Sequence, residues 1–161
     1  NSIGPLVNEA AVEKVDKQVQ DALAKGATLH TGGQRLRGEG LDKGHFYAPT
    51  MISAITPDML IYREETFGPV AAVVPFDDED DVIAMANDTS YGLAAYVYTQ
   101  NLSRAVRSFE ALHFGIIGIN DINPTSAAAP FGGMKESGLG REGAREGIEE
   151  YLETKLGGFS V

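Results

Sequence analysis

Two adjacent carboxylates, Glu64 and Glu65, open the segment EETFGPV directly before the apolar run 70–76. A carboxylate can accept hydrogen bonds from two vicinal hydroxyls, so at the rim of a parallel sheet this pair could bind a ribose. Phe67 is near enough in sequence to press against a flat ring. The alternative is a solvated loop with one hydrophobic anchor, and the residue types alone leave both interpretations open.

A second candidate is the glycine-rich segment 130–142, PFGGMKESGLGRE. The string GLGREG at 138–143 matches the dinucleotide pattern G-x-G-x-x-G. That fingerprint requires a strand directly before it, a βαβ unit of about 30 residues and an acidic residue about 20 positions further on. Here a glycine-rich loop precedes it, and Val161 follows too soon for a second strand and its acid. We therefore interpret these glycines as residues of tight turns.

The third segment, ANDTSYGL at 86–93, joins a predicted helix to a predicted strand. Gly92 is expected to adopt a backbone conformation that other residues rarely reach. Asn87 and Thr89 are expected to bond nearby backbone groups, as short polar side chains do in turns. This segment is therefore predicted to be structural.

Other kinds of chemistry are disfavoured by composition. The three histidines lack metal-ligand spacing, and the acidic run 77–81 lacks the glycine and distal glutamate of a calcium loop, so no metal site is predicted. The absence of cysteine excludes disulfides and thiolate metal sites, and we expect a cytoplasmic protein. A net charge of -10 provides no basic stripe for nucleic acid or an anionic membrane, and no apolar run could span a bilayer.

Periodicity indicates the elements that must position these segments. Apolar residues at the 3.6 period predict a helix over 8–25, with Asn8 as its cap and Gly26 at its end. Strand, helix, strand, helix, strand then implies right-handed crossovers and a parallel sheet flanked by helices, with 70–76 covered on both faces. The remaining predicted elements are strands at 27–31, 46–55, 93–99, 116–120 and 152–161, helices at 78–88, 101–112 and 142–151, and a loop at 121–141.

Taken together, EETFGPV, ANDTSYGLAA and PFGGMKESGLGREG resemble the carboxyl-terminal part of the aldehyde dehydrogenase superfamily. IGPLVNEAAVEKV, GATLHTGG and YAPT fit the same pattern, and the ending SGLGREGAREGIEEYLETK is most similar to succinate-semialdehyde dehydrogenases. The resemblance implies an α/β fold of the catalytic-domain type, a three-layer sandwich whose mainly parallel sheet is flanked by helices. Residues 1–151 would form part of that domain, and 152–161 a strand joining a sheet built with a neighbouring subunit of a homo-oligomer.

The resemblance also implies roles for individual residues. Glu65 matches the residue that bonds the nicotinamide ribose of NAD or NADP, and Phe67 matches the aromatic that packs near the nicotinamide. Phe131 matches a residue lining the aldehyde tunnel. Thr125 lies where relatives place a substrate-contacting side chain, with Ser126 beside it as a second candidate. The implied substrate is a small aldehyde, expected to be succinate semialdehyde.

Family members attack the aldehyde with a cysteine thiolate, pass hydride from the thiohemiacetal to the nicotinamide cofactor and hydrolyse the resulting thioester. This chain has no cysteine and begins at Asn1 without a methionine. We therefore expect a piece of a longer NAD(P)-dependent enzyme, with no catalytic residue of its own and no activity in isolation. The alternative is a non-catalytic oligomerisation or interaction module derived from the family.

Overall fold

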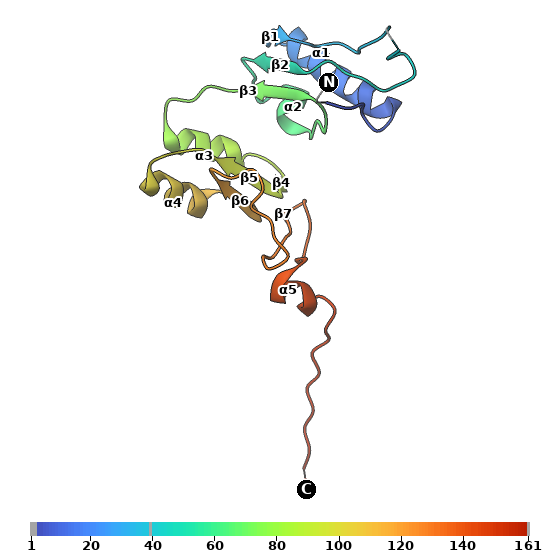
Figure 1. The fold of residues 1–161 in the computed structure, drawn as a ribbon. Coiled ribbons are helices and arrows are strands. Elements are labelled where there is room, and N and C mark those ends of the chain that lie inside the picture. Colours follow the sequence, from blue (N-terminus) through green and yellow to red (C-terminus); the bar gives the residue numbers. More distant parts are fainter. Residues whose placement is uncertain (1–2, 39, 161) are drawn as a thin grey trace. The chain divides into compact units, whose positions relative to one another are not determined.

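A computed structural model describes residues 3–38 and 40–160 of the chain. The chain divides into two compact units, Asn1–Phe76 and Asp77–Val161. In Figure 1 the elements of the first unit run from blue to green, and those of the second from yellow-green to red. The predicted division into 1–151 and 152–161 stays a prediction.

The first unit is built on helix α1 (Glu9–Ala24). The side chain of Asn8 accepts a hydrogen bond from the Ala11 N–H at 2.9 Å, which satisfies one of the donors left free at a helix start. Gly26, at a φ of 99°, follows its end. The predicted apolar stripe is buried, and Gln18 is completely buried along with it.

Three strands pack beside α1, in the order β1 (Thr28–Thr31), β2 (Thr50–Ser53) and β3 (Val70–Val73). β1 and β2 are antiparallel, and β2 and β3 are parallel, with Thr50 opposite Val70. The one-turn helix α2 (Leu60–Arg63) was not predicted. The expectation that 70–76 is covered on both faces is wrong for this chain, because β3 lies at the end of its sheet and residues 71–73 are exposed.

In the second unit, the strands β5 (Ala94–Val97) and β6 (Ile116–Ile119) form a parallel pair. Helix α4 (Leu102–Ala111) connects them, and α3 (Glu79–Asn87) lies beside α4 (Figure 1). Asp78 and Asn101 cap α3 and α4 by accepting hydrogen bonds from backbone N–H groups. The parallel pairs joined through helices confirm the α/β class, although the described strands form three small sheets and not one.

Two short strands that were not predicted, β4 (Tyr91–Gly92) and β7 (Met134–Lys135), pair antiparallel. β7 therefore lies inside the stretch expected to be a loop. Helix α5 (Ala144–Glu149) follows.

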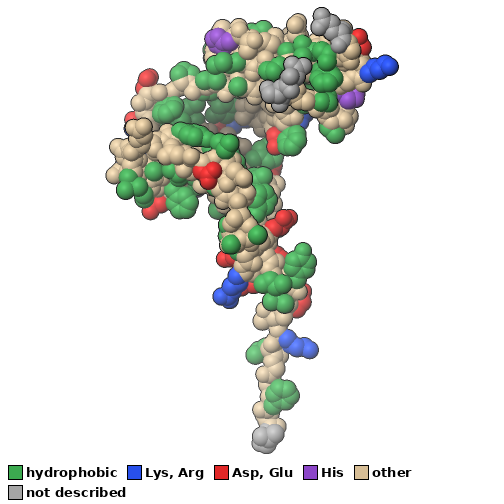
Figure 2. Space-filling model, viewed as in Figure 1, with side chains coloured by type: hydrophobic (Ala, Val, Ile, Leu, Met, Phe, Trp, Pro, Cys, Tyr) green, Lys and Arg blue, Asp and Glu red, His purple; other side chains and the backbone are tan. Residues whose placement is uncertain are grey.

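The carboxyl-terminal residues run away from α5 as an extended trace (Figure 1). Over the described residues 152–160 no strand forms, in contrast to the strand predicted at 152–161, because a strand needs a neighbour for its ladder of hydrogen bonds and no described segment pairs with this one. Hydrophobic side chains stand out along this tail in Figure 2, and Leu156 and Phe159 are almost fully exposed. Across the described ranges, no helix is both long and apolar enough to cross a bilayer.

Candidate functional site

The loop between α2 and β3 carries the first group of predicted site residues. Its two carboxylates behave differently, although they are neighbours in sequence. Glu64 accepts a hydrogen bond at 3.2 Å from the side-chain amide of the buried Gln18. Glu65 is exposed, and within residues 3–38 and 40–160 its carboxylate has no hydrogen-bond partner. Of the two, Glu65 is therefore the carboxylate with both oxygens available for a ligand hydroxyl.

Phe67 presents its ring to solvent two residues later. The side chain is 80% exposed, and the backbone has a φ of 49°, in the left-handed region. A residue other than glycine held there costs about 1 kcal/mol or more, and such strain is concentrated at binding and active sites. An exposed aromatic ring on a strained turn beside a free carboxylate is suited to binding a flat ring attached to a sugar.

The second group lies in the other unit, on the loop between β6 and β7. Thr125 and Phe131 line the same small pocket, of about 160 Å³, whose other walls are apolar or backbone. The Thr125 hydroxyl donates a hydrogen bond to Asn123 Oδ1 at 2.9 Å, which leaves its lone pairs available. Ser126 is exposed and is not among the residues lining this pocket. Thr125 and Phe131 are thus brought together as predicted, and Ser126 is not.

Close backbone packing fixes the loop that carries Phe131. Phe131 and Glu142 exchange two backbone hydrogen bonds, at 2.7 and 2.8 Å. A Cβ on Gly115 would collide with the carbonyl oxygen of Gly132, so only glycine permits this approach. Lys135 Nζ donates to the Thr89 carbonyl oxygen at 3.0 Å. The backbone on either side of Phe131 is therefore held in place.

The segment 86–93 supplies part of this support. The expectation of an unusual backbone conformation at Gly92 is wrong: the residue lies in β4 and does not have a positive φ, and a Cβ there would come within 3.0 Å of the carbonyl oxygens of His113 and Met134. Thr89 accepts a hydrogen bond from the Tyr91 N–H, a local contact. Asn87 differs from the prediction because its partners are distant in sequence. Its amide donates to the Ala111 carbonyl oxygen, and its oxygen accepts from the His113 N–H.

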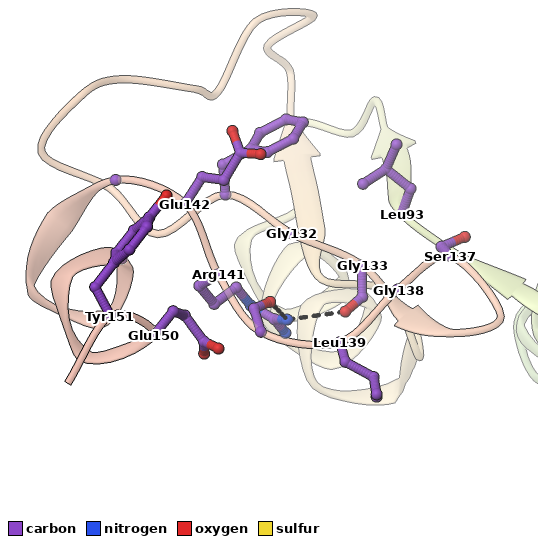
Figure 3. Close-up of a pocket in the computed structure, with 14 residues that line it drawn as sticks. Leu93, Gly132, Gly133, Ser137, Gly138, Leu139, Arg141, Glu142, Glu150 and Tyr151 are labelled. Atoms are coloured by element: carbon purple, nitrogen blue, oxygen red, sulfur yellow. Dashed lines mark hydrogen bonds between the residues drawn. The ribbon is translucent and has the colours of Figure 1, made fainter. Parts of the chain in front are cut away.

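A larger cavity of about 700 Å³ lies against the glycine-rich segment (Figure 3). Arg141 Nη1 donates to the carbonyl oxygens of Gly133, at 2.8 Å, and Gly140, at 2.6 Å, so this arginine braces the loop from inside. Gly138, Gly140 and Gly143 all have positive φ, as the tight-turn interpretation predicts. Sequence reasoning missed Arg141, and no pattern around it distinguishes it from a solvated arginine.

Comparison with known proteins shows which protein family carries loops of this kind. The model of the aldehyde dehydrogenase family matches residues 1–156. The chain belongs to the aldehyde dehydrogenase family. The resemblance seen in the motifs is thereby confirmed.

Three individual relatives show how similar the chain is to members of this family and how much of each it covers. The chain is 52% identical, over 154 residues, to the mitochondrial succinate-semialdehyde dehydrogenase of Oryza sativa, covering 96% of this chain and 28% of that protein. It is 50% identical to the non-phosphorylating aspartate-semialdehyde dehydrogenase of Halomonas elongata, covering 95% of this chain and 30% of that protein. The structure of betaine aldehyde dehydrogenase from Staphylococcus aureus in complex with NAD+ matches with a TM-score of 0.90 and 40% identity, over 96% of this chain and 31% of that chain. The aldehyde dehydrogenase family fold therefore holds over nearly the whole chain, which spans under a third of these relatives.

Proposed function

We propose that this chain supplies the nicotinamide-side cofactor contacts and part of the substrate pocket of an NAD(P)-dependent aldehyde dehydrogenase. The observation that carries the proposal is the pairing of a free carboxylate, Glu65, with an exposed ring, Phe67, on one loop of a chain that belongs to this family. Glu65 would accept hydrogen bonds from ribose hydroxyls, and Phe67 would pack near the nicotinamide. When bound, the cofactor supplies a hydride acceptor.

The substrate proposed is succinate semialdehyde or a close relative, an aldehyde that also carries a carboxylate. Two of the similar proteins are named for semialdehydes of this kind. Within the pocket, Phe131 would pack against the carbon chain, and the Thr125 hydroxyl would bond a polar group of the substrate. Ser126 would contact the substrate only after a rearrangement of its loop, since it does not line the pocket in this structure.

The isolated chain is proposed to be inactive, because it holds no cysteine and a serine or threonine hydroxyl does not replace a thiolate without a paired base. The test is to assay the chain with succinate semialdehyde and either NAD+ or NADP+, beside a Glu65→Gln variant. Neither protein is expected to exceed background. Turnover that disappears in the variant would refute the proposed inactivity.

Binding can be tested without turnover. Nicotinamide mononucleotide is expected to shift the NMR signals of Glu65 and Phe67, and Glu65→Gln is expected to weaken this response at least fivefold. If the mononucleotide leaves these signals unchanged at millimolar concentration, the proposed cofactor contacts are wrong.

A second candidate function, a non-catalytic oligomerisation module, rests on the extended tail. Leu156 and Phe159 are 98% and 95% exposed, and an unpaired extended segment can add to the sheet edge of another chain. Sedimentation of the whole chain and of a version ending at residue 151 would test this. The longer protein is expected to associate with rising concentration and the shorter one to remain monomeric; a monomeric profile for both would exclude the module.

A further inference from the structure

Two side chains of α1 and that of its C-cap residue form a ladder that holds the segment leading to the proposed cofactor loop. They are Gln18, Asp21 and Lys25, spaced three and four residues apart and therefore on one face of the helix. Lys25 Nζ donates to the carbonyl oxygen of Asp58 at 2.6 Å. Asp21 Oδ2 accepts from the Leu60 N–H at 2.8 Å. Gln18 Nε2 donates to Glu64 Oε2 at 3.2 Å. Going back along the helix from residue 25 to residue 18, the contacted residues therefore advance from 58 to 64.

The ladder explains why a single helical turn is stable at 60–63. Forming an isolated turn fixes the backbone of several residues and gains only one hydrogen bond, so α2 is not stable through its intrinsic helix propensity alone. Asp21 satisfies a donor at the start of α2, and Gln18 binds the residue directly after its end. The N–H of Leu60 and then the Lys25 ammonium hold the pKa of Asp21 below its usual value, so its carboxylate stays charged.

Gln18 is the most unusual member, because its side chain is completely buried among valines while its Oε1 atom has no hydrogen-bond partner within the described chain. A buried acceptor without a partner costs about 1–3 kcal/mol. Among residues 3–38 and 40–160, the bond from Nε2 to Glu64 is the one hydrogen bond of this buried amide. The same contact engages one oxygen of Glu64, whereas the Glu65 carboxylate has no hydrogen-bond partner within the described chain.

We propose that Gln18, Asp21 and Lys25 are positioning residues that fix the orientation of Glu65 and Phe67 for the cofactor. The inference rests on the proposed function, since it is the nicotinamide half of the cofactor that these two residues would meet. α1 and its C-cap residue act at a distance from the ligand: their side chains hold Asp58, Leu60 and Glu64, and Glu65 follows directly after the last of these. The left-handed turn at Phe67 then points the ring outward.

The test uses the full chain and two NMR measurements, amide hydrogen exchange and titration with nicotinamide mononucleotide. Asp21→Ala is expected to speed exchange of the Leu60 amide at least tenfold and to weaken the mononucleotide response at Glu65 at least fivefold. Asp21→Asn keeps an oxygen acceptor for Leu60 and is expected to restore exchange to within about threefold of the original protein. Gln18→Met keeps the volume and removes the donor, and it is expected to shift the signals of residues 64–67.

Lys14→Met is the matched control, because Lys14 is an exposed residue of the same helix outside the ladder. It should change neither measurement, and exchange of buried α1 amides such as that of Val19 should remain slow in every variant. Unchanged exchange at Leu60 in Asp21→Ala, together with unchanged signals at 64–67 in Gln18→Met, would overturn the proposal. If the unsubstituted chain fails to respond to the mononucleotide, the proposed function is wrong. Exchange of the Leu60 amide and the signal positions of residues 64–67 would still decide whether the ladder positions the loop.

Discussion

Asn87 offers the most direct test of how the second unit is held together. It is the last residue of α3, and its side chain reaches the carboxyl-terminal end of α4. Nδ2 donates to the Ala111 carbonyl oxygen at 2.9 Å, and Oδ1 accepts from the His113 N–H at 2.8 Å. One amide thus satisfies two backbone groups at the point where the chain leaves α4 for β6.

The Asn87→Ala substitution removes both hydrogen bonds. Each contributes about 1 kcal/mol net, and a half-buried backbone group left without a partner adds a further penalty of about 1 kcal/mol. His113 is exposed, so water can replace its lost partner, whereas the penalty at half-buried Ala111 remains. The expected loss is about 2.5 kcal/mol of local stability. Asn87→Asp keeps the acceptor for His113 but removes the donor to Ala111, so about 2 kcal/mol of that loss, the bond and the penalty at Ala111, is still expected.

Native-state hydrogen exchange at α4 is the appropriate assay, because it reports this unit without requiring the whole chain to unfold together. The Leu112 amide, bonded to the Ser108 carbonyl oxygen at 3.1 Å, is a suitable probe. A loss of about 2.5 kcal/mol corresponds to exchange about 60-fold faster. An acceleration below threefold in Asn87→Ala, or exchange at the original rate in Asn87→Asp, would refute the reasoning.

Two further predictions concern the same unit. Arg104 donates a hydrogen bond to Glu79 and thereby lowers the pKa of this carboxyl below its ordinary value of 4.5. The stability that Glu79 contributes is therefore present above pH 4.5 and is lost as the pH falls through the lower pKa of the folded state. Glu79→Gln should flatten that acid dependence, measured as exchange at α3 between pH 3 and 6, and an unchanged profile would contradict this assignment. Gly115→Ala should destabilise the β5–β6 pair by about 3 kcal/mol, because the added Cβ meets the backbone of Gly132. Gly4 has open space around it, so the control Gly4→Ala should leave hydrogen exchange unaltered. Equal effects at the two glycines would show that the close approach is unimportant.

The long helices could be predicted from sequence because their signals are local. Asn8, Asp78 and Asn101 each provide a side-chain acceptor for the first turn of a helix, and the observed helices begin directly after them. The apolar spacing in 8–25 also identified the buried stripe. It gave no indication of Gln18, because a polar residue on an apolar face is explained only by a partner 46 residues away.

The short elements could not be predicted, because each depends on a distant partner. α2 needs Asp21 of α1, and β4 exists only as the partner of β7. The converse applies to the tail, whose residues have strand-like composition but no neighbour in the described chain. Of the candidate site, the resemblance singled out Glu65, Phe67, Thr125 and Phe131, and the structure adds that Thr125 and Phe131 line one pocket. The Gln18 contact to Glu64 could not be read from the sequence, and the roles of these residues stay predictions.

The extended form of residues 152–160 has a consequence for handling the protein. Proteases accept their substrates as extended segments, and exposed termini are cut first. Lys155 therefore offers trypsin a cleavage point whose use would release Leu156 and Phe159 without touching a helix or strand. Brief digestion would yield a trimmed protein with less exposed hydrophobic surface and an intact fold, suitable for the NMR titrations that both proposals require.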